Sequence, residues 1–88
     1  MNAQIKKIMN RLSELSDNDI AAHSRRFFKT GKGEYGEGDR FLGIRVPAIR
    51  KCVKEYREIS LEDTLKLLKS PFHEARLLAL LILVVKYS

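Results

Sequence analysis

The sequence of 88 residues contains one cysteine, Cys52, and no tryptophan. One cysteine excludes an internal disulfide and any metal site made from several cysteines. The two histidines, His23 and His73, are far apart and belong to no cluster with metal-ligand spacing, so neither a metal nor another cofactor is expected. A cysteine on a helix is usually a small buried hydrophobe, and we expect this of Cys52 rather than a Cys–His nucleophilic pair.

Long hydrophobic runs are also scarce. The longest, Leu77 to Val85, has about half of the ~20 residues that a membrane-spanning helix requires. The N-terminal residues, Met1 to Lys7, mix polar and charged types and lack the apolar core of a signal peptide. We therefore expect a cytoplasmic protein that does not cross a membrane.

The net charge of +6 is concentrated in the middle of the chain. The stretches from Met1 to Ala22 and from Glu58 to Ser88 are each neutral. The stretch from His23 to Arg57 holds ten basic and four acidic residues, a difference that accounts for the whole excess. A localised basic excess attracts phosphate backbones by counterion release. The alternative is a solvated basic surface that keeps the protein in solution.

Helical spacing runs through the sequence, and no segment alternates as a strand would. The first helix is expected over residues 3–15, with an apolar stripe formed by Ile5, Ile8, Met9, Leu12 and Leu15. Ser16 and Asp19 resemble a capping box and predict the start of a second helix that ends near Thr30. The inward side chains of this helix are expected to be Ile20, Ser24, Phe27 and Phe28.

Three more helices are expected after a loop from Lys32 to Arg45. Pro47 suits the first turn of the third helix, because its missing N–H is not needed there. The apolar stripe of this helix is Ile49, Val53 and Tyr56. Ser60 and Asp63 repeat the capping pattern before a fourth helix with Leu61, Leu65 and Leu68. Ser70 and Pro71 open a fifth, from Phe72 to about Tyr87.

About five short helices with short connections predict an all-α protein, in which antiparallel helix pairs stack as a HEAT-like α-solenoid. Residues 77–85 leave no polar face, and a helix that is apolar all round is buried all round. Four short helices cover one side of it at most. We therefore expect residues 1–88 to be the N-terminal part of a repeat domain that is incomplete at its C-terminal end. Self-association through Leu77–Val85 is the competing explanation.

Glycines at positions 31, 33 and 36 match the pattern G-x-G-x-x-G of dinucleotide-binding proteins. That pattern binds a dinucleotide between a strand and a helix, whereas here it follows a helix. Glu34, Glu37 and Asp39 would also repel a pyrophosphate. The glycines are instead expected to end the second helix and to allow turns with positive φ. The three acidic residues are expected to form ion pairs that order the loop.

Basic side chains recur at helical spacing in two places. Arg25, Arg26 and Lys29 share part of the second helix, and Arg50, Lys54 and Arg57 share one side of the third. Helices that project basic side chains in register suit contacts with phosphates. For any one of these residues, a solvated helix face is the alternative.

The stretch Phe41-Leu-Gly-Ile-Arg-Val-Pro47, followed by Arg50, resembles the DNA alkylation repair family, the helical-repeat alkylpurine DNA glycosylases. The similarity begins at Phe28, and the segment from Pro71 to Leu80, which includes Glu74, also resembles a repeat of that family. Most of the chain is covered.

The resemblance implies a right-handed solenoid of paired helices with a concave basic surface for double-stranded DNA. It also implies hydrolysis of the N-glycosidic bond of N3- and N7-alkylated purines, whose positive charge makes them good leaving groups. A carboxylate between aromatic faces would stabilise the oxocarbenium-like sugar and position a water. In the family, the catalytic aspartate and its tryptophans lie in later repeats. No catalytic residue is therefore expected in this chain, and the chemistry is expected beyond Ser88.

The sequence thus predicts the N-terminal portion of a DNA glycosylase, which supplies scaffold and contacts to the DNA backbone. The DNA-binding candidates are Arg26, Lys29, Arg45, Arg50, Lys54 and Arg57. For Arg45 and Arg50 the alternative is ion pairs that hold the loop on the third helix. The alternative for the whole chain is a non-catalytic helical module that binds a protein partner, or a second copy of itself, through the last helix.

Overall fold

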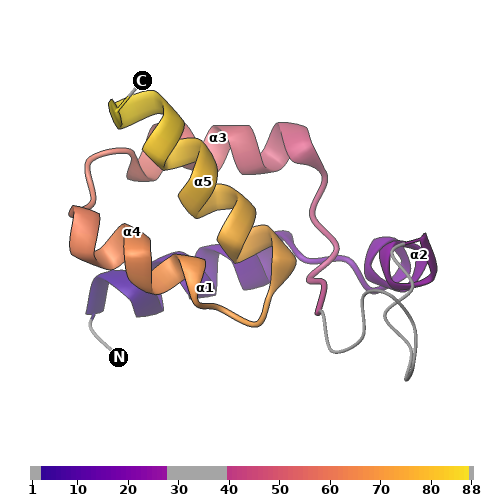
Figure 1. Cartoon of the computed structure of the whole chain (residues 1–88). Coiled ribbons are helices and arrows are strands. Elements are labelled where there is room, and N and C mark those ends of the chain that lie inside the picture. The colour runs from indigo at the N-terminus through magenta and orange to yellow at the C-terminus, as the bar shows by residue number, and fades with distance from the viewer. Residues whose placement is uncertain (1–2, 28–39, 88) are drawn as a thin grey trace.

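The computed structural model describes residues 3–27 and 40–87, and this part of the chain forms five α-helices and no strand (Figure 1). The helices are α1 (Ala3–Leu15), α2 (Asn18–Phe27), α3 (Val46–Tyr56), α4 (Leu61–Leu68) and α5 (His73–Tyr87). The expected all-α fold with about five helices is confirmed. The stacking of helix pairs into a solenoid stays a prediction.

Four of the helices enclose one hydrophobic core. Helix α5 lies across α3 and α4, and α4 also contacts α1 (Figure 1). Helices α1 and α3 contribute the apolar positions that recur at helical spacing, since these lie on one face. Helix α4 instead buries Thr64 and Leu67, while Leu61 and Leu65 are 46% and 45% exposed. The side chains that are completely or almost completely buried include Ile8, Leu12, Ile49, Cys52, Leu67, Leu78 and Ile82. The predicted stripes of α1 and α3 are thus confirmed.

Local sequence sets where three of the helices begin. Pro47 lies in the first turn of α3, as expected. The Ser60 side chain accepts a hydrogen bond from the backbone N–H of Asp63 at 3.1 Å and caps α4. Helix α5 begins at His73, one residue later than expected, because the N–H of Phe72 donates to the hydroxyl of Ser70.

The start of α2 differs from the predicted capping box. Asp17, rather than Ser16, is the capping residue: its Oδ1 accepts from the N–H groups of Asp19 at 2.9 Å and Ile20 at 3.0 Å. The Ser16 hydroxyl instead donates to the carbonyl of Ser13 at the end of α1. The pattern was ambiguous because a serine and an aspartate, two good capping residues, stand side by side.

Helix α2 stands apart from the other four and has no extensive contact with any of them (Figure 1). Ala21 is its buried residue. The predicted inward position of Phe27 is wrong, since 70% of this residue is exposed. Phe28 and the predicted helix end near Thr30 lie outside the described residues.

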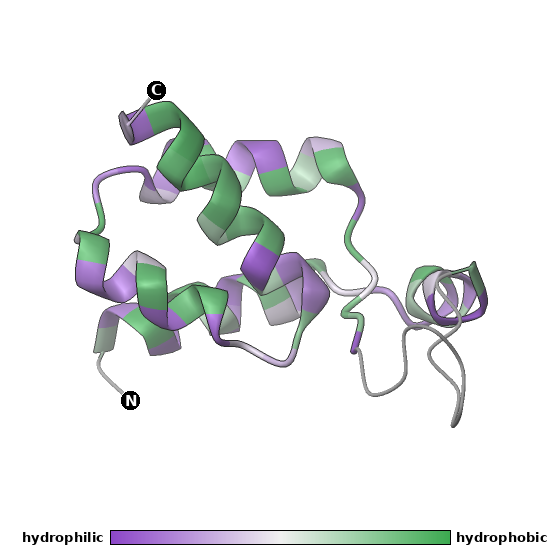
Figure 2. Cartoon of the chain, viewed as in Figure 1, coloured by the Kyte–Doolittle hydropathy of each residue, from purple (hydrophilic) through white to green (hydrophobic). Residues whose placement is uncertain are grey.

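Helix α5 is apolar on two faces, and the described fold covers only one of them (Figure 2). Ala75, Leu78, Ala79 and Ile82 are fully buried against α3 and α4. Leu80 is 51% exposed and Val84 is 60% exposed on the opposite face. The expectation that α5 is buried all round is therefore not met within this fold. None of the described helices has the length and apolarity to span a membrane.

Candidate nucleic-acid interface

Three of the predicted DNA-binding residues lie together on one side of α3. Arg50, Lys54 and Arg57 follow each other at spacings of four and three, so their side chains share a flank of the helix. All three are exposed, whereas Ile49 and Val53 on the adjoining face are buried in the core. Packing of the apolar face thus fixes the direction in which the basic flank points.

Arg45 is the N-cap residue of α3. Its backbone is extended, with φ −75° and ψ 153°, and its side chain makes no capping hydrogen bond. The side chain is exposed, five positions before Arg50 and at the N-terminal end of the same helix. The structure therefore places two of the six predicted residues, Arg50 and Lys54, within α3, and two more, Arg45 and Arg57, as its N-cap and C-cap residues.

The other two predicted residues belong to the α2 region. Arg26 is exposed near the end of α2, and Lys29 lies outside the described residues. Asp19, His23 and Arg26 recur at helical spacing and so lie on one side of α2. Arg26 thus lies beside the edge of the α2 face that lines the cavity described next, and is not itself a lining residue.

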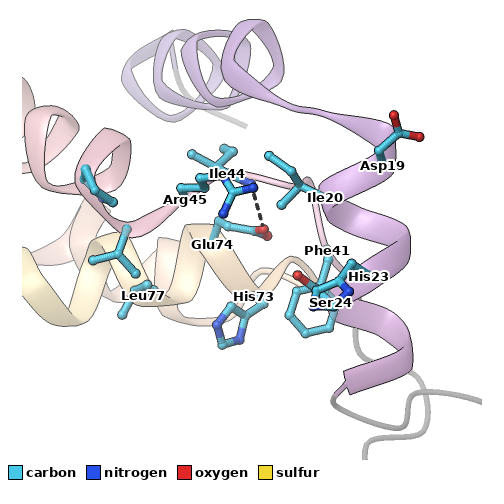
Figure 3. A pocket seen from close by; sticks show the side chains of 12 residues that line it. Asp19, Ile20, His23, Ser24, Phe41, Ile44, Arg45, His73, Glu74 and Leu77 are labelled. Carbon is cyan, nitrogen blue, oxygen red and sulfur yellow. Dashed lines mark hydrogen bonds between the residues drawn. The ribbon is translucent and has the colours of Figure 1, made fainter.

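A cavity of about 690 Å³ separates α2 from the starts of α3 and α5. Figure 3 shows Ile20 and His23 of α2 on one side of it and Leu77 of α5 on the other. Arg45 borders it at the start of α3. The remaining lining residues are Asp19, Ser24, Phe41, Ile44, Val46, Pro47, His73 and Glu74.

The carboxylate of Glu74 organises the backbone that forms one wall of this cavity. One oxygen accepts from the N–H of Leu42 at 2.8 Å, and the other accepts from the N–H of Gly43 at 2.9 Å. The second oxygen also accepts from the N–H of Ile44 at 3.3 Å, the bond that is drawn in Figure 3. Glu74 is only 3% exposed. Because charge-assisted hydrogen bonds from three backbone donors offset desolvation, this carboxylate is tolerated in the interior.

Two further contacts hold the same segment. The N–H of His73 donates to the carbonyl of Arg40 at 2.8 Å, and the rings of Phe41 and His73 lie 4.9 Å apart between centroids. Phe41 itself is 7% exposed. Residues 40–44 are therefore fastened to the first turn of α5.

Sequence reasoning missed this role of Glu74. A signal was present, because Glu74 is the one acidic residue in a helix that is otherwise almost entirely apolar. The alternative that Arg45 and Arg50 hold the loop through ion pairs stays a prediction, because the acidic residues of the loop lie outside the described residues. Ion pairs among the described residues include Arg11 with Glu14 and Glu55, Arg57 with Glu58, and Lys66 with Glu62. The predicted ion pairs of Glu34, Glu37 and Asp39 lie outside these residues.

Cys52 is buried in the core, as expected. Burial raises the pKa of its thiol above the ordinary value, which disfavours the thiolate that nucleophilic chemistry requires. Among residues 3–27 and 40–87, no three histidine, cysteine or carboxylate side chains gather as metal ligands would.

These features define the chain as a small all-helical protein with exposed basic side chains on α2 and α3. Comparison with protein families gives the particular family: the model described as "DNA alkylation repair enzyme" matches residues 8–88. This match spans nearly the whole chain, so the protein belongs to the DNA alkylation repair family, and its role is in DNA repair. No curated protein and no solved structure matches it significantly.

Proposed function

We propose that this chain forms the N-terminal portion of a DNA glycosylase that hydrolyses the N-glycosidic bond of N3- and N7-alkylated purines. The observation that carries the proposal is the family match over residues 8–88. In this proposal, residues 1–88 provide scaffold and contacts to the DNA backbone. The aspartate and the tryptophans that perform the chemistry lie outside this stretch, which contains no tryptophan.

The proposed DNA surface consists of Arg45, Arg50, Lys54 and Arg57 along α3, together with Arg26 and Lys29 from the α2 region. Support comes from the exposure of the described members and from the shared flank of the three on α3. Side chains of this kind contact phosphates without reading sequence, and each contact releases counterions from the duplex. The affinity for double-stranded DNA is therefore expected to fall steeply as salt rises.

The proposed surface is tested by replacing Arg50, Lys54 and Arg57 together with alanine. We expect the slope of log affinity against log salt to become shallower by about 2 to 3, because three phosphate contacts are lost. The measurement is fluorescence anisotropy with a duplex of mixed sequence at several salt concentrations. The matched control replaces Lys6, Lys7 and Lys66, which removes the same charge from α1 and α4. If the α3 variant keeps its affinity within about twofold, α3 is not part of the surface.

The proposed activity is tested with the natural polypeptide and a duplex that carries N7-methylguanine. Release of the free base, followed by strand cleavage at the abasic site, is the expected result. An intact-mass measurement of the same polypeptide determines whether it extends past Ser88. Base release that requires a longer polypeptide supports the proposed division of roles, and base release by residues 1–88 alone contradicts it.

The outer face of α5 favours a second candidate function. Leu80, Val84 and Tyr87 are exposed and follow each other at spacings of four and three, as in a seam that packs against another helix. A non-catalytic module would use this face to bind a protein partner or a second copy of the chain. Binding through such a face is expected to change little with salt, whereas DNA binding weakens steeply. Sedimentation at several protein concentrations tests self-association directly.

A further inference from the structure

Helix α2 joins the rest of the described structure through residues 42–43 rather than through extensive helix packing. The N–H of Asp17 donates to the carbonyl of Leu42 at 3.0 Å. Gly43 has φ +83°, and a Cβ there would overlap the carbonyl oxygen of Asp17 and lie 2.7 Å from the nitrogen of Ala21. The backbone of α2 therefore rests directly on Gly43, which no larger residue could allow.

The same two residues are attached on their other side to α5. Glu74 accepts hydrogen bonds from the N–H groups of Leu42 and Gly43, and also from that of Ile44, two residues before α3 begins. One buried carboxylate thus holds the backbone that supports α2 and the backbone that leads into α3. The relative placement of α2 and α3 depends on this junction.

Basic residues lie on both sides of the junction. Arg45 borders the cavity at the start of α3, and Arg26 is exposed near the C-terminal end of α2, beside the edge of the face that lines the cavity. Neither residue contacts Glu74 through a hydrogen bond or an ion pair described here. Apart from the through-space effect of its charge, Glu74 can act on these two residues through the backbone of residues 42–44 that it holds.

We propose that Glu74 is a positioning residue for DNA binding: by holding residues 42–44, it lets Arg26 on α2 and Arg45 on α3 contact the backbone of one duplex together. This inference rests on the proposed DNA-binding function. The physical advantage is preorganisation. If α2 were loosely attached, DNA binding would have to order it. The entropy cost of that ordering would offset the free energy gained from the contact of Arg26 with DNA.

The test is the Glu74→Gln substitution combined with Arg26→Ala in the full chain. A glutamine keeps the shape but has one accepting oxygen, and its NH₂ group opposes N–H groups of the backbone. The matched control is Glu62→Gln, which removes the same charge from an exposed position at the start of α4. Because both substitutions make the net charge more positive, electrostatics alone would strengthen DNA binding in both.

The readout is the salt slope of duplex binding in a double-mutant cycle. In the otherwise unmodified chain and in Glu62→Gln, Arg26→Ala is expected to make the slope shallower by about one. In Glu74→Gln, the same substitution is expected to leave the slope unchanged, and Glu74→Gln alone is expected to weaken binding despite the added positive charge. A loss of global stability would not produce this coupling when binding is measured well below the unfolding temperature.

If Glu74→Gln does not fold, Gly43→Ala takes its place in the same double-mutant cycle with Arg26→Ala. This substitution disrupts the junction from the α2 side and leaves Glu74 in place. The proposal is overturned if Arg26→Ala changes the slope equally in the presence and absence of an intact junction. A chain that shows no salt-dependent binding to duplex DNA before any substitution would overturn the proposed function, and this inference with it. Independent effects in a chain that does bind DNA would overturn the inference alone.

Discussion

The four-helix core and helix α2 are held in place by different forces. The core is made of completely buried aliphatic side chains such as Leu78 and Ile82, which come from helices that pack against one another. Helix α2 buries mainly Ala21 and is attached by a backbone hydrogen bond and by a close approach at Gly43. A substitution in the core costs stability in proportion to the buried side-chain atoms that it removes. A substitution at the junction can disrupt the attachment of α2 by adding or removing a single atom. The two regions should therefore respond differently to substitution.

The two faces of α5 also differ, in whether the described fold covers them. Its inner face meets α3 and α4, and its outer face is equally apolar but exposed at Leu80 and Val84. The buried Glu74 in the first turn serves neither face and instead binds residues 42–44. A single helix thus contributes to the core, to the junction with α2, and to a surface suited for contact with another helix.

The largest effect is expected for Leu78→Ala in the centre of the core. Leu78 is fully buried, so the truncation should lower the free energy of unfolding by about 2 to 5 kcal/mol. Urea unfolding followed by circular dichroism measures this. The matched control is Leu80→Ala, two residues further along α5 on the exposed face. This substitution should lower the free energy of unfolding by less than about 1 kcal/mol. Equal costs would mean that the outer face of α5 is also covered in solution.

A smaller and more local effect is expected for Gly43→Ala. The positive φ alone should cost about 1 to 3 kcal/mol, and the overlap with Asp17 adds to it. Because the strain is relieved when α2 moves away, amide hydrogen exchange should accelerate in α2 and remain slow in α4 and α5. Uniform acceleration over all helices would show that α2 and the core unfold as one unit, and that α2 is not the more weakly attached region.

Removal of the capping side chain of α2 or of α4 should lower stability by about 1 kcal/mol in each case, and the effects should differ in where they appear. Asp17→Ala removes the acceptor for the N–H groups of Asp19 and Ile20, and Ser60→Ala removes the acceptor for that of Asp63. We expect Asp17→Ala to lower protection within α2 only, and Ser60→Ala to lower the stability of the whole core. Hydrogen exchange distinguishes these outcomes. A global loss of stability in Asp17→Ala would contradict the weak attachment of α2.

The smallest effect concerns pH and is confined to the core. Burial raises the pKa of Cys52 above its ordinary value of 9.0, so the folded state holds this proton more tightly than the unfolded chain does. The associated stability is fully present below pH 9 and is lost as the pH rises toward the folded-state pKa. Tyr56, whose pKa is also raised by burial, adds a decline in the same range. Urea unfolding at pH 8 and pH 10 should therefore show a steeper decline in the unmodified chain than in Cys52→Ala. Identical declines would mean that the thiol does not contribute.

Most of the secondary structure could be predicted from local patterns. The stripe from Ile5 to Leu12, Pro47 in the first turn of α3 and the cap at Ser60 depend only on residues close in sequence. The start of α2 was misassigned by one residue, because Ser16 and Asp17 are both capable caps and only the packed structure determines which is used. Phe27 was expected inside on apolarity alone, but α2 has no neighbouring helix to cover it.

The candidate DNA surface was predictable in part for the same reason. The spacing of Arg50, Lys54 and Arg57 places them on one flank of any helix, whatever surrounds it. The cavity beside Arg45 was not predictable, since it is bounded by residues from three separate segments.

The sequence by itself determined the helices, the apolar sides of α1 and α3, and the side of α3 on which the basic residues lie, because these follow from the 3.6-residue period and from local capping. Tertiary structure alone decided that Glu74 binds the N–H groups of Leu42, Gly43 and Ile44, some thirty residues earlier in the chain. It also decided which face of α5 is buried, since both faces are apolar and only the packing of α3 and α4 distinguishes them. The physical reason is that hydrogen-bond partners and burial depend on which distant segments meet, and no local period specifies that.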